Sequence, residues 1–170
     1  METSTLIGNY LLGGAINAAV LVAIAFALSR FAKDSYGRSL LAIFLVIAGG
    51  AYVGFAIVAE ASGLWALAEL LHAIALGALG LLGLRRSPYW LALGWALHPL
   101  WDVPLHFFGG GHEFAPESWA IACVTFDWVV ALYIVLAYRR SGGSRFRFRT
   151  GLPAAKMHRQ TVPANPGAVR

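Results

Sequence analysis

The sequence predicts an all-α membrane protein, a polytopic bundle of five transmembrane helices. Of its 170 residues, 59% are hydrophobic and 12% are charged, whereas soluble domains are roughly half apolar and a quarter charged. The apolar residues form long blocks of roughly 20 residues, the length that crosses a hydrocarbon core of about 30 Å as a helix. The blocks lack the two-residue alternation of membrane strands, so a barrel is excluded.

Polar and glycine residues separate the five apolar blocks. Basic residues follow the first block, Ser62-Gly63 follows the second, Arg85-Arg86-Ser87-Pro88 follows the third, and three glycines follow the fourth. The sequence therefore predicts one transmembrane domain, residues 1–140. Its helices are expected at about 6–28, 39–59, 64–84, 88–108 and 117–138.

The basic residues predict the orientation of the bundle. All 13 Lys and Arg residues fall on one side of a five-helix arrangement, in the first and third connections and after the fifth helix. By the positive-inside rule that side is cytoplasmic, so the N-terminus is expected outside and the C-terminus inside. The first block follows no basic residue and is longer than the apolar region of a signal peptide, so a retained helix is expected. We expect a multi-pass protein of the plasma membrane, or of the inner membrane in a bacterium.

The last part of the chain, residues 141–170, differs in composition from the rest. Gly, Pro, Ser and Arg replace Leu and Ala there, which predicts a basic, disordered cytoplasmic tail. Its alternating Arg and Phe residues are typical of a segment on anionic lipid headgroups, although they would serve equally well as a simple topology signal. Membrane lipids are the expected partners, and the net charge of +5 gives little support for nucleic-acid binding.

Acidic and histidine side chains gather in the half of the bundle away from the basic residues. A charge at the centre of a membrane helix costs about 2.5–3.5 kcal/mol even on the lenient insertion scale, so such groups normally face the bundle interior and have partners. We therefore expect one shared polar site that opens toward the outside. Its members are Glu69, His72, His98, Asp102, His106 and Asp127.

The fourth block places three of these groups on one helix face. His98, Asp102 and His106 are four residues apart, so each lies about 6 Å further along the helix than the one before. In a straight helix the two histidines would be about 12 Å apart, too far to share one metal ion. Pro99 and Pro104 each remove a backbone hydrogen bond, which predicts a kink near the site.

The donor set favours a metal site. Imidazole and carboxylate groups without a Met or thiolate cluster suit Zn²⁺ or a non-haem iron better than copper. In this hypothesis the metal-ligand candidates are His72, His98, His106 and Asp127, and the catalytic candidates are Glu69 and Asp102. Glu69 and His72 also form the Glu-x-x-His element of di-iron bundles, although here it occurs once.

Three classes of function stay open. The first is an intramembrane metal-dependent enzyme, a hydrolase or oxidoreductase, that acts on a lipid-like or hydrophobic substrate. The second is a proton- or cation-coupled transporter, in which Glu60, Glu69, His72, His98 and Asp127 would form a relay. The third is an accessory protein whose polar network only sets helix packing. Apart from the terminal Arg residues, the inner halves of the helices lack ionisable residues, which favours a one-sided site over a through-pathway.

Two other features are expected to be structural. Cys123 is the only cysteine, so no intramolecular disulfide can form, and we expect a small buried packing residue. Gly50-x3-Gly54 and the series Gly77, Gly80 and Gly83 favour close helix packing, and such glycine-rich faces also suit a homo-oligomer.

A resemblance rests on the fourth block, which reads HPLWDVPLH, and on the Glu69 and His72 pair in the third. In this layout the chain resembles the small bacterial polytopic membrane families that are classed as domains of unknown function. The resemblance covers residues 1 to about 140 and implies no particular activity.

A more distant similarity is to the intramembrane zinc hydrolases related to alkaline ceramidases. Those enzymes have seven helices, whereas five are expected here, and histidines and an aspartate from several helices hold their Zn²⁺ near one membrane face. The similarity implies zinc ligands at His72, His98 and His106, with Asp102 or Asp127 as a partner.

Overall fold

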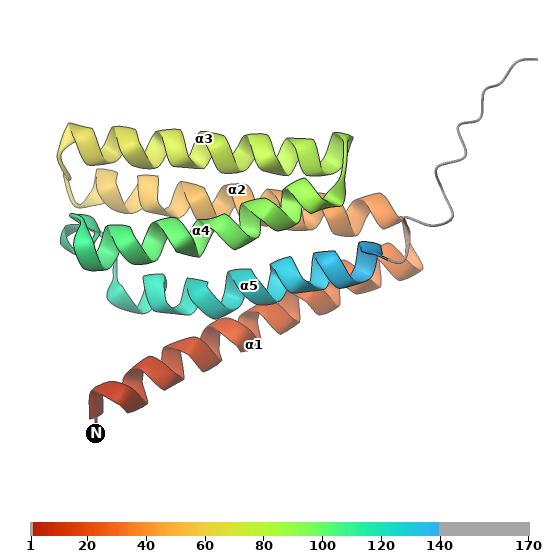
Figure 1. Ribbon diagram of the computed structural model, residues 1–170, viewed down its shortest axis with the longest axis horizontal. Helices are drawn as coiled ribbons and strands as arrows, with labels where there is room; N and C mark the ends of the chain where they lie inside the picture. The colour runs from red at the N-terminus through yellow and green to blue at the C-terminus, as the bar shows by residue number, and fades with distance from the viewer. Residues whose placement is uncertain (1, 140–170) are drawn as a thin grey trace, which may run out of the picture.

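The computed structural model describes residues 2–139, which form a bundle of five α-helices (Figure 1). The helices are α1 (Glu2–Phe31), α2 (Asp34–Val58), α3 (Gly63–Arg85), α4 (Pro88–Phe108) and α5 (Glu117–Arg139), with a short 3-10 turn, η1 (Gly111–Glu113), before α5. No strand occurs within this part of the chain, so the all-α prediction is confirmed. The expected tail, 141–170, lies outside the described residues.

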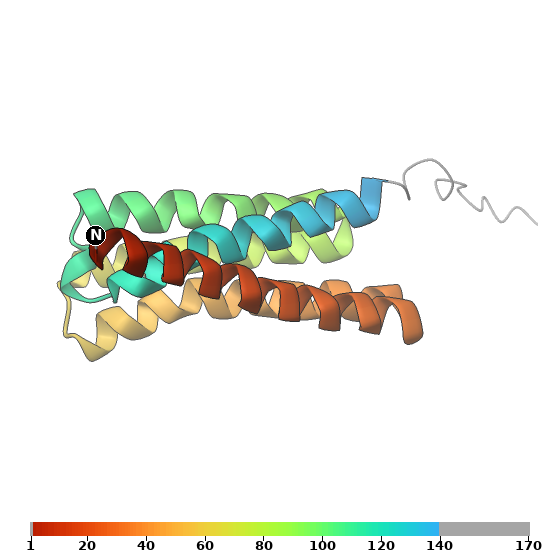
Figure 2. The ribbon, with the colours of Figure 1, turned by 90° about the horizontal axis from the view of Figure 1, so that it is seen from below.

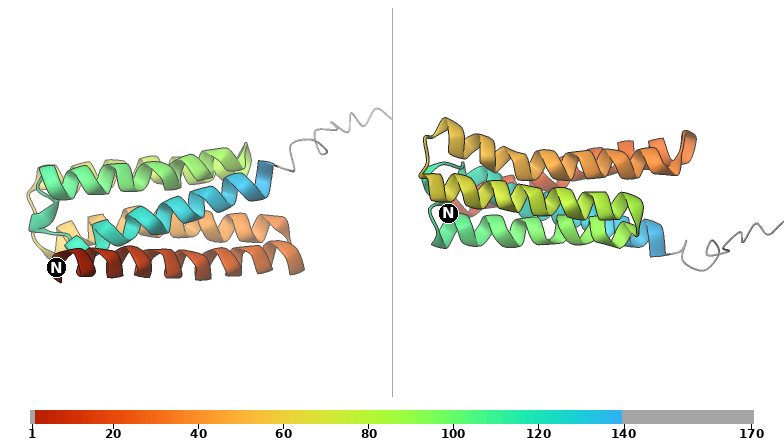
Figure 3. Two further views of the ribbon diagram at one scale, coloured as in Figure 1. Left: turned by 60° about the horizontal axis from the view of Figure 1, so that its bottom comes forward. Right: turned by 90° about the horizontal axis from the view of Figure 1, so that it is seen from above.

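The helices pack side by side along one axis. α1 packs on α5 and α2, α2 packs on α3, and α4 packs between α3 and α5. The N-terminus, the α2–α3 connection and η1 lie at one end of the bundle, and the α1–α2 and α3–α4 connections lie at the other (Figures 2 and 3). The second end, called here the basic end, carries every Lys and Arg of the described chain: Arg30, Lys33, Arg38, Arg85, Arg86 and Arg139.

Four of the helices, α1, α2, α3 and α5, are long and apolar enough to cross a membrane, which makes this a multi-pass membrane protein. Their outward-facing Leu, Ile, Val and Phe side chains are extensively exposed, as expected of a surface that faces lipid. α4 is not among the four, because His98, Asp102 and two prolines lower its hydropathy. At 21 residues it is nevertheless about 32 Å long.

The first connection is shorter than the sequence suggested. α1 continues to Phe31 and α2 already begins at Asp34, so only residues 32–33 join them. The Asp34 carboxylate lies at the N-terminal end of α2, where the helix dipole favours negative charge. It also lies 3.4 Å from the Arg38 guanidinium and accepts a hydrogen bond of 3.1 Å from the Tyr138 hydroxyl. The hydrogen bond from Tyr138 attaches the start of α2 to the end of α5.

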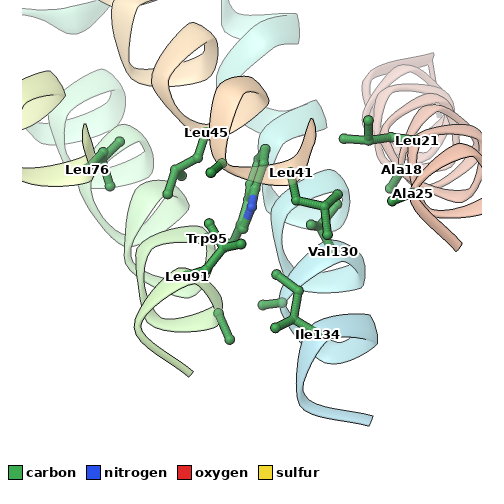
Figure 4. Close-up of a cluster of buried hydrophobic side chains, with 13 residues drawn as sticks. Ala18, Leu21, Ala25, Leu41, Leu45, Leu76, Leu91, Trp95, Val130 and Ile134 are labelled. Carbon is green, nitrogen blue, oxygen red and sulfur yellow. The ribbon is translucent and has the colours of Figure 1, made fainter. Parts of the chain in front are cut away.

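Two apolar clusters fill the interior. The larger one lies toward the basic end and joins all five helices around Trp95, with Leu41 and Leu45 from α2 and Val130 from α5 among its members (Figure 4). The smaller one lies at the opposite end and contains Tyr52, Ala56, Leu105, Phe114 and Ala115. Along α4 and α5 the ionisable residues fall between these clusters.

Glycine permits the closest approach of α1 to α5. A Cβ atom on Gly14 would collide with the Ala122 carbonyl oxygen and the Thr125 hydroxyl. The same hydroxyl donates a hydrogen bond of 2.6 Å to the Leu11 carbonyl, which holds the two backbones together. Gly83 approaches α4 in a similar way, whereas a Cβ atom on Gly50 or Gly54 would meet nothing within 4 Å. The expected close packing therefore occurs at Gly83 and does not involve Gly50 or Gly54.

Gly14→Ala is expected to destabilise the bundle relative to Gly13→Ala. Both changes add one methyl group to α1, but nothing lies within 4 Å of a Cβ atom at Gly13. The helix-propensity gain is the same at both sites, so the difference isolates overpacking, which costs about 1–3 kcal/mol. The free energy of unfolding in mixed detergent and dodecyl sulfate micelles, followed by circular dichroism, measures it. Equal stability of the two variants would contradict the close contact.

Candidate metal centre

Polar side chains from four helices meet between the two apolar clusters. Four of them, Glu69, His98, Asp102 and Asp127, have no exposed surface, which is unusual for ionisable groups. The full group is Tyr52 from α2, Glu69 and His72 from α3, His98 and Asp102 from α4, and Cys123 and Asp127 from α5. Because α3 and α5 begin, and α4 ends, away from the basic end, the group occupies the middle and the less basic half of the bundle.

His98 is at the centre of the group. Its Nδ1 lies 2.7 Å from Asp127 Oδ2, and an ionised carboxylate only accepts, so Nδ1 carries the proton that is shared with Asp127. In the neutral ring this leaves Nε2 with a free lone pair. Nε2 lies 3.5 Å from Asp102 Oδ2 and has no hydrogen-bond partner in the described chain.

His98, Asp102 and Cys123 form a compact group of residues that could hold a metal ion. Each offers one ligand atom, and these atoms lie within 4.8 Å of one another. Two ligands of a tetrahedral Zn²⁺ are about 3.3–3.8 Å apart, given bond lengths of about 2.0–2.3 Å. The 3.5 Å between His98 Nε2 and Asp102 Oδ2 lies in that range. Nitrogen, oxygen and sulfur together suit zinc.

The contact between His98 and Asp127 matches the environment of a histidine ligand. A metal-bound imidazole usually donates its second ring N–H to a carboxylate or carbonyl, which holds the ring and its tautomer. Asp127 occupies that position, on the nitrogen opposite to the one that faces Asp102. The sequence analysis suggested Asp127 as a direct ligand, and in the structure its carboxylate is hydrogen-bonded to His98 Nδ1.

Several buried polar atoms in the group lack hydrogen-bond partners among the described residues. These atoms are Tyr52 Oη, Glu69 Oε2, His98 Nε2 and Asp127 Oδ1, whereas the Asp102 carboxylate interacts with the Cys123 thiol. Buried polar atoms are nearly always paired, and an unpaired one costs about 1–3 kcal/mol. The carboxylates of Asp102, Asp127 and Glu69 all interact electrostatically with the His98 imidazole.

Glu69 and His72 border the centre on the α3 side. The Trp101 indole N–H donates to Glu69 Oε1 over 3.1 Å, which leaves Oε2 free. The His72 ring stacks on His98, with ring centres 5.6 Å apart, and lies 4.9 Å from the Trp101 ring. His72 therefore contacts the face of His98 and is outside the ligand group. Trp101 is 37% exposed, so it reaches from the bundle surface to Glu69.

The structure separates His106 from the other candidates. It lies one helical turn beyond Asp102, is 5% exposed, and contacts Phe107 and His112 rather than the ligand group. Glu60 is exposed at the end of α2. Pro99 and Pro104, from which a kink was predicted, both lie inside α4, which is one continuous helix from Pro88 to Phe108.

Cys123 is the residue that sequence reasoning left out of the site. Assigned there to packing, it is buried, with its sulfur near the ligand atoms of His98 and Asp102. A signal was present in the spacing, because Cys123-x3-Asp127 places a thiol and a carboxylate on one face of α5, as His98-x3-Asp102 places an imidazole and a carboxylate on one face of α4.

Among the comparisons with known proteins, only the family comparison gives a match. Neither a curated protein nor a solved structure shows significant similarity to the chain. The model of a family of unknown function, DUF6010, matches residues 13–140, which include every residue of the candidate metal centre. The resemblance to a family of unknown function is thus confirmed, and the chain belongs to the DUF6010 family.

Proposed function

We propose that the protein is a membrane metalloprotein in which His98, Asp102 and Cys123 hold a divalent ion, zinc in the first instance. The observation that carries the proposal is the buried three-residue group with its imidazole oriented by Asp127. Structural zinc sites normally have four protein ligands, whereas catalytic sites have three and keep a fourth position open. Three ligands in a membrane protein therefore favour a catalytic or exchangeable ion.

We assign the centre to hydrolysis of a lipid-like substrate. Zinc supplies Lewis-acid activation of water in such sites. Glu69 keeps one carboxylate oxygen free and interacts electrostatically with His98, so it is positioned to accept a proton as general base. The free Tyr52 hydroxyl is available to stabilise a developing negative charge. Trp101 leads from the outer surface of the bundle to Glu69, which favours entry of a hydrophobic substrate from the bilayer.

We further propose that all five helices cross a cell membrane, with the N-terminus outside and the basic end in the cytoplasm. α4 packs between α3 and α5, which are both apolar enough to span, and its polar residues face the interior. The basic residues at one end support the orientation. The metal centre would then lie between the midplane and the outer side.

Proton or cation transport is the second candidate. The buried carboxylates of Glu69, Asp102 and Asp127 beside one histidine are the type of group that carries protons in membrane proteins. Transport also needs a polar route to the other side. Toward the basic end the interior is the larger apolar cluster, and the buried polar or charged side chains of the described residues, Glu69, His98, Asp102, His106 and Asp127, lie outside it. This apolar barrier favours the one-sided centre.

The purified wild type is expected to retain at least one zinc or iron ion per chain in inductively coupled plasma mass spectrometry. His98→Ala and Cys123→Ser should each retain one ion fewer than the wild type, because each removes a ligand of this centre. Asp127→Asn should weaken binding about 10–100-fold, as loss of an orienting partner does. His72→Ala, which removes a stacked ring, is the matched control and should keep the metal. The proposed metal centre would be contradicted if the wild type stayed metal-free after reconstitution, or if all four variants lost the same amount of bound metal.

The hydrolase assignment is tested with long-chain fluorogenic esters and amides in detergent micelles. Glu69→Gln is expected to retain the metal and to lower kcat about 10²–10⁴-fold, the usual contribution of a general base. Glu113→Gln, on the exposed η1 turn, is the control and should leave kcat unchanged. If the fully metal-loaded wild type cleaves neither class, the hydrolase assignment is wrong and proton flux in liposomes becomes the next assay.

Single-cysteine accessibility tests the topology. Ser62→Cys and Glu113→Cys are expected to react with a membrane-impermeant maleimide added outside intact cells, and Ala32→Cys only after permeabilisation. The buried Cys123 should stay unlabelled in the wild type. If Glu113→Cys and Ser62→Cys label from opposite sides, α4 does not cross the membrane.

A further inference from the structure

A second group of metal-ligating side chains lies at the less basic end of the bundle, outside the centre described above. His106 follows Asp102 by one turn of α4 and has 5% of its surface exposed. Its Nδ1 is buried and has no hydrogen-bond partner in the described chain. A nine-tenths buried imidazole with an unused nitrogen needs a partner, and no neighbouring side chain supplies one.

His112, on η1, lies opposite His106. The two ring centres are 6.5 Å apart and the rings are nearly perpendicular, at 84°. The His112 Nδ1 lies 3.1 Å from the Gly109 carbonyl oxygen, which can only accept, so Nδ1 donates and the neutral ring has its Nε2 lone pair free. A ring nitrogen donating to a backbone carbonyl is the usual arrangement behind a metal-binding histidine.

Glycines hold the turn against α4. A Cβ atom on Gly111 would lie 2.9 Å from the His106 Cα, and one on Gly110 would collide with the Trp65 indole. The backbone of the turn is thereby kept close to His106. His112 itself is exposed to solvent, so its ring can pivot about the hydrogen bond to the Gly109 carbonyl.

Glu117 supplies a carboxylate near His106. Glu117, the first residue of α5, is exposed and interacts electrostatically with His106. Two histidines and one glutamate are a known zinc ligand set. Two imidazoles on one tetrahedral ion have ring centres about 5 Å apart, so His112 must move inward by about 1.5 Å to share it with His106.

We propose that His106, His112 and Glu117 form a second, outer metal site, which takes a zinc-class divalent cation from water. Imidazole ligands favour transition metals over Ca²⁺ and Mg²⁺, which prefer all-oxygen sites. The outer site lies one turn of α4, about 6 Å, from the inner ligand Asp102. The outer site shares no ligand with the inner centre of His98, Asp102 and Cys123, so one proposal can be wrong while the other is right.

Zinc titration of chelator-stripped, full-length protein against a chromophoric chelator tests the proposal. The wild type is expected to bind two Zn²⁺ ions and His112→Ala one. The His98→Ala variant should retain only the outer ion, and its affinity should fall at least about tenfold when His112→Ala is added. His158→Ala is the matched control for loss of any histidine and should bind as the wild type does.

Cobalt separates the two sites spectroscopically. Co²⁺ bound beside Cys123 produces a thiolate charge-transfer band, whereas the outer ligands contain no sulfur. Wild type and His112→Ala should therefore show the same band, and His98→Ala should bind Co²⁺ without it. The outer site is overturned if His112→Ala leaves both the zinc stoichiometry and the affinity of the His98→Ala background unchanged. If no metal binds at His98, Asp102 and Cys123 but the outer site exists, the wild type should lack the charge-transfer band and still bind one ion that His112→Ala removes.

Discussion

The hydrogen bond between His98 and Asp127 is the contact on which the rest of the polar interior depends. It joins α4 to α5 at a depth where both residues have no exposed surface. It also determines which ring nitrogen is free, and thereby directs Nε2 toward Asp102. Single inter-helix hydrogen bonds in membranes average well under 1 kcal/mol. The importance of this one lies in the ring orientation that it imposes rather than in its strength.

The two apolar clusters explain how an otherwise hydrophobic bundle contains this group. They pack above and below it along the helix axes, so the carboxylates contact neither lipid chains nor bulk water. The polar face of α4 is turned toward α3 and α5, which supply His72, Glu69, Cys123 and Asp127. α4 carries two prolines and several polar residues, and it packs between α3 and α5.

The two ends of the bundle differ in the polarity of their interior. The basic end is closed by hydrophobic packing around Trp95 and by the contact between Asp34 and Tyr138. Toward the other end, Asp102, His106 and His112 follow one another outward, each with ring or carboxylate atoms available to a cation. This gradient supports chemistry that is supplied from one side of the membrane.

Local properties of the sequence determined the helical class, the apolar spans and the existence of one buried polar group. Block length, hydropathy and the cost of burying a charge depend on neighbouring residues along the chain, so they can be evaluated without a structure. The contacts within the group were decided by tertiary structure, because they depend on how each helix is rotated against the next. That rotation brings Cys123 to His98 and Asp102, makes Asp127 an orienting partner, stacks His72 on an imidazole face, and leaves His106 beside His112. Spacing along one helix cannot show this, because each contact joins residues from different helices or from a helix and a turn.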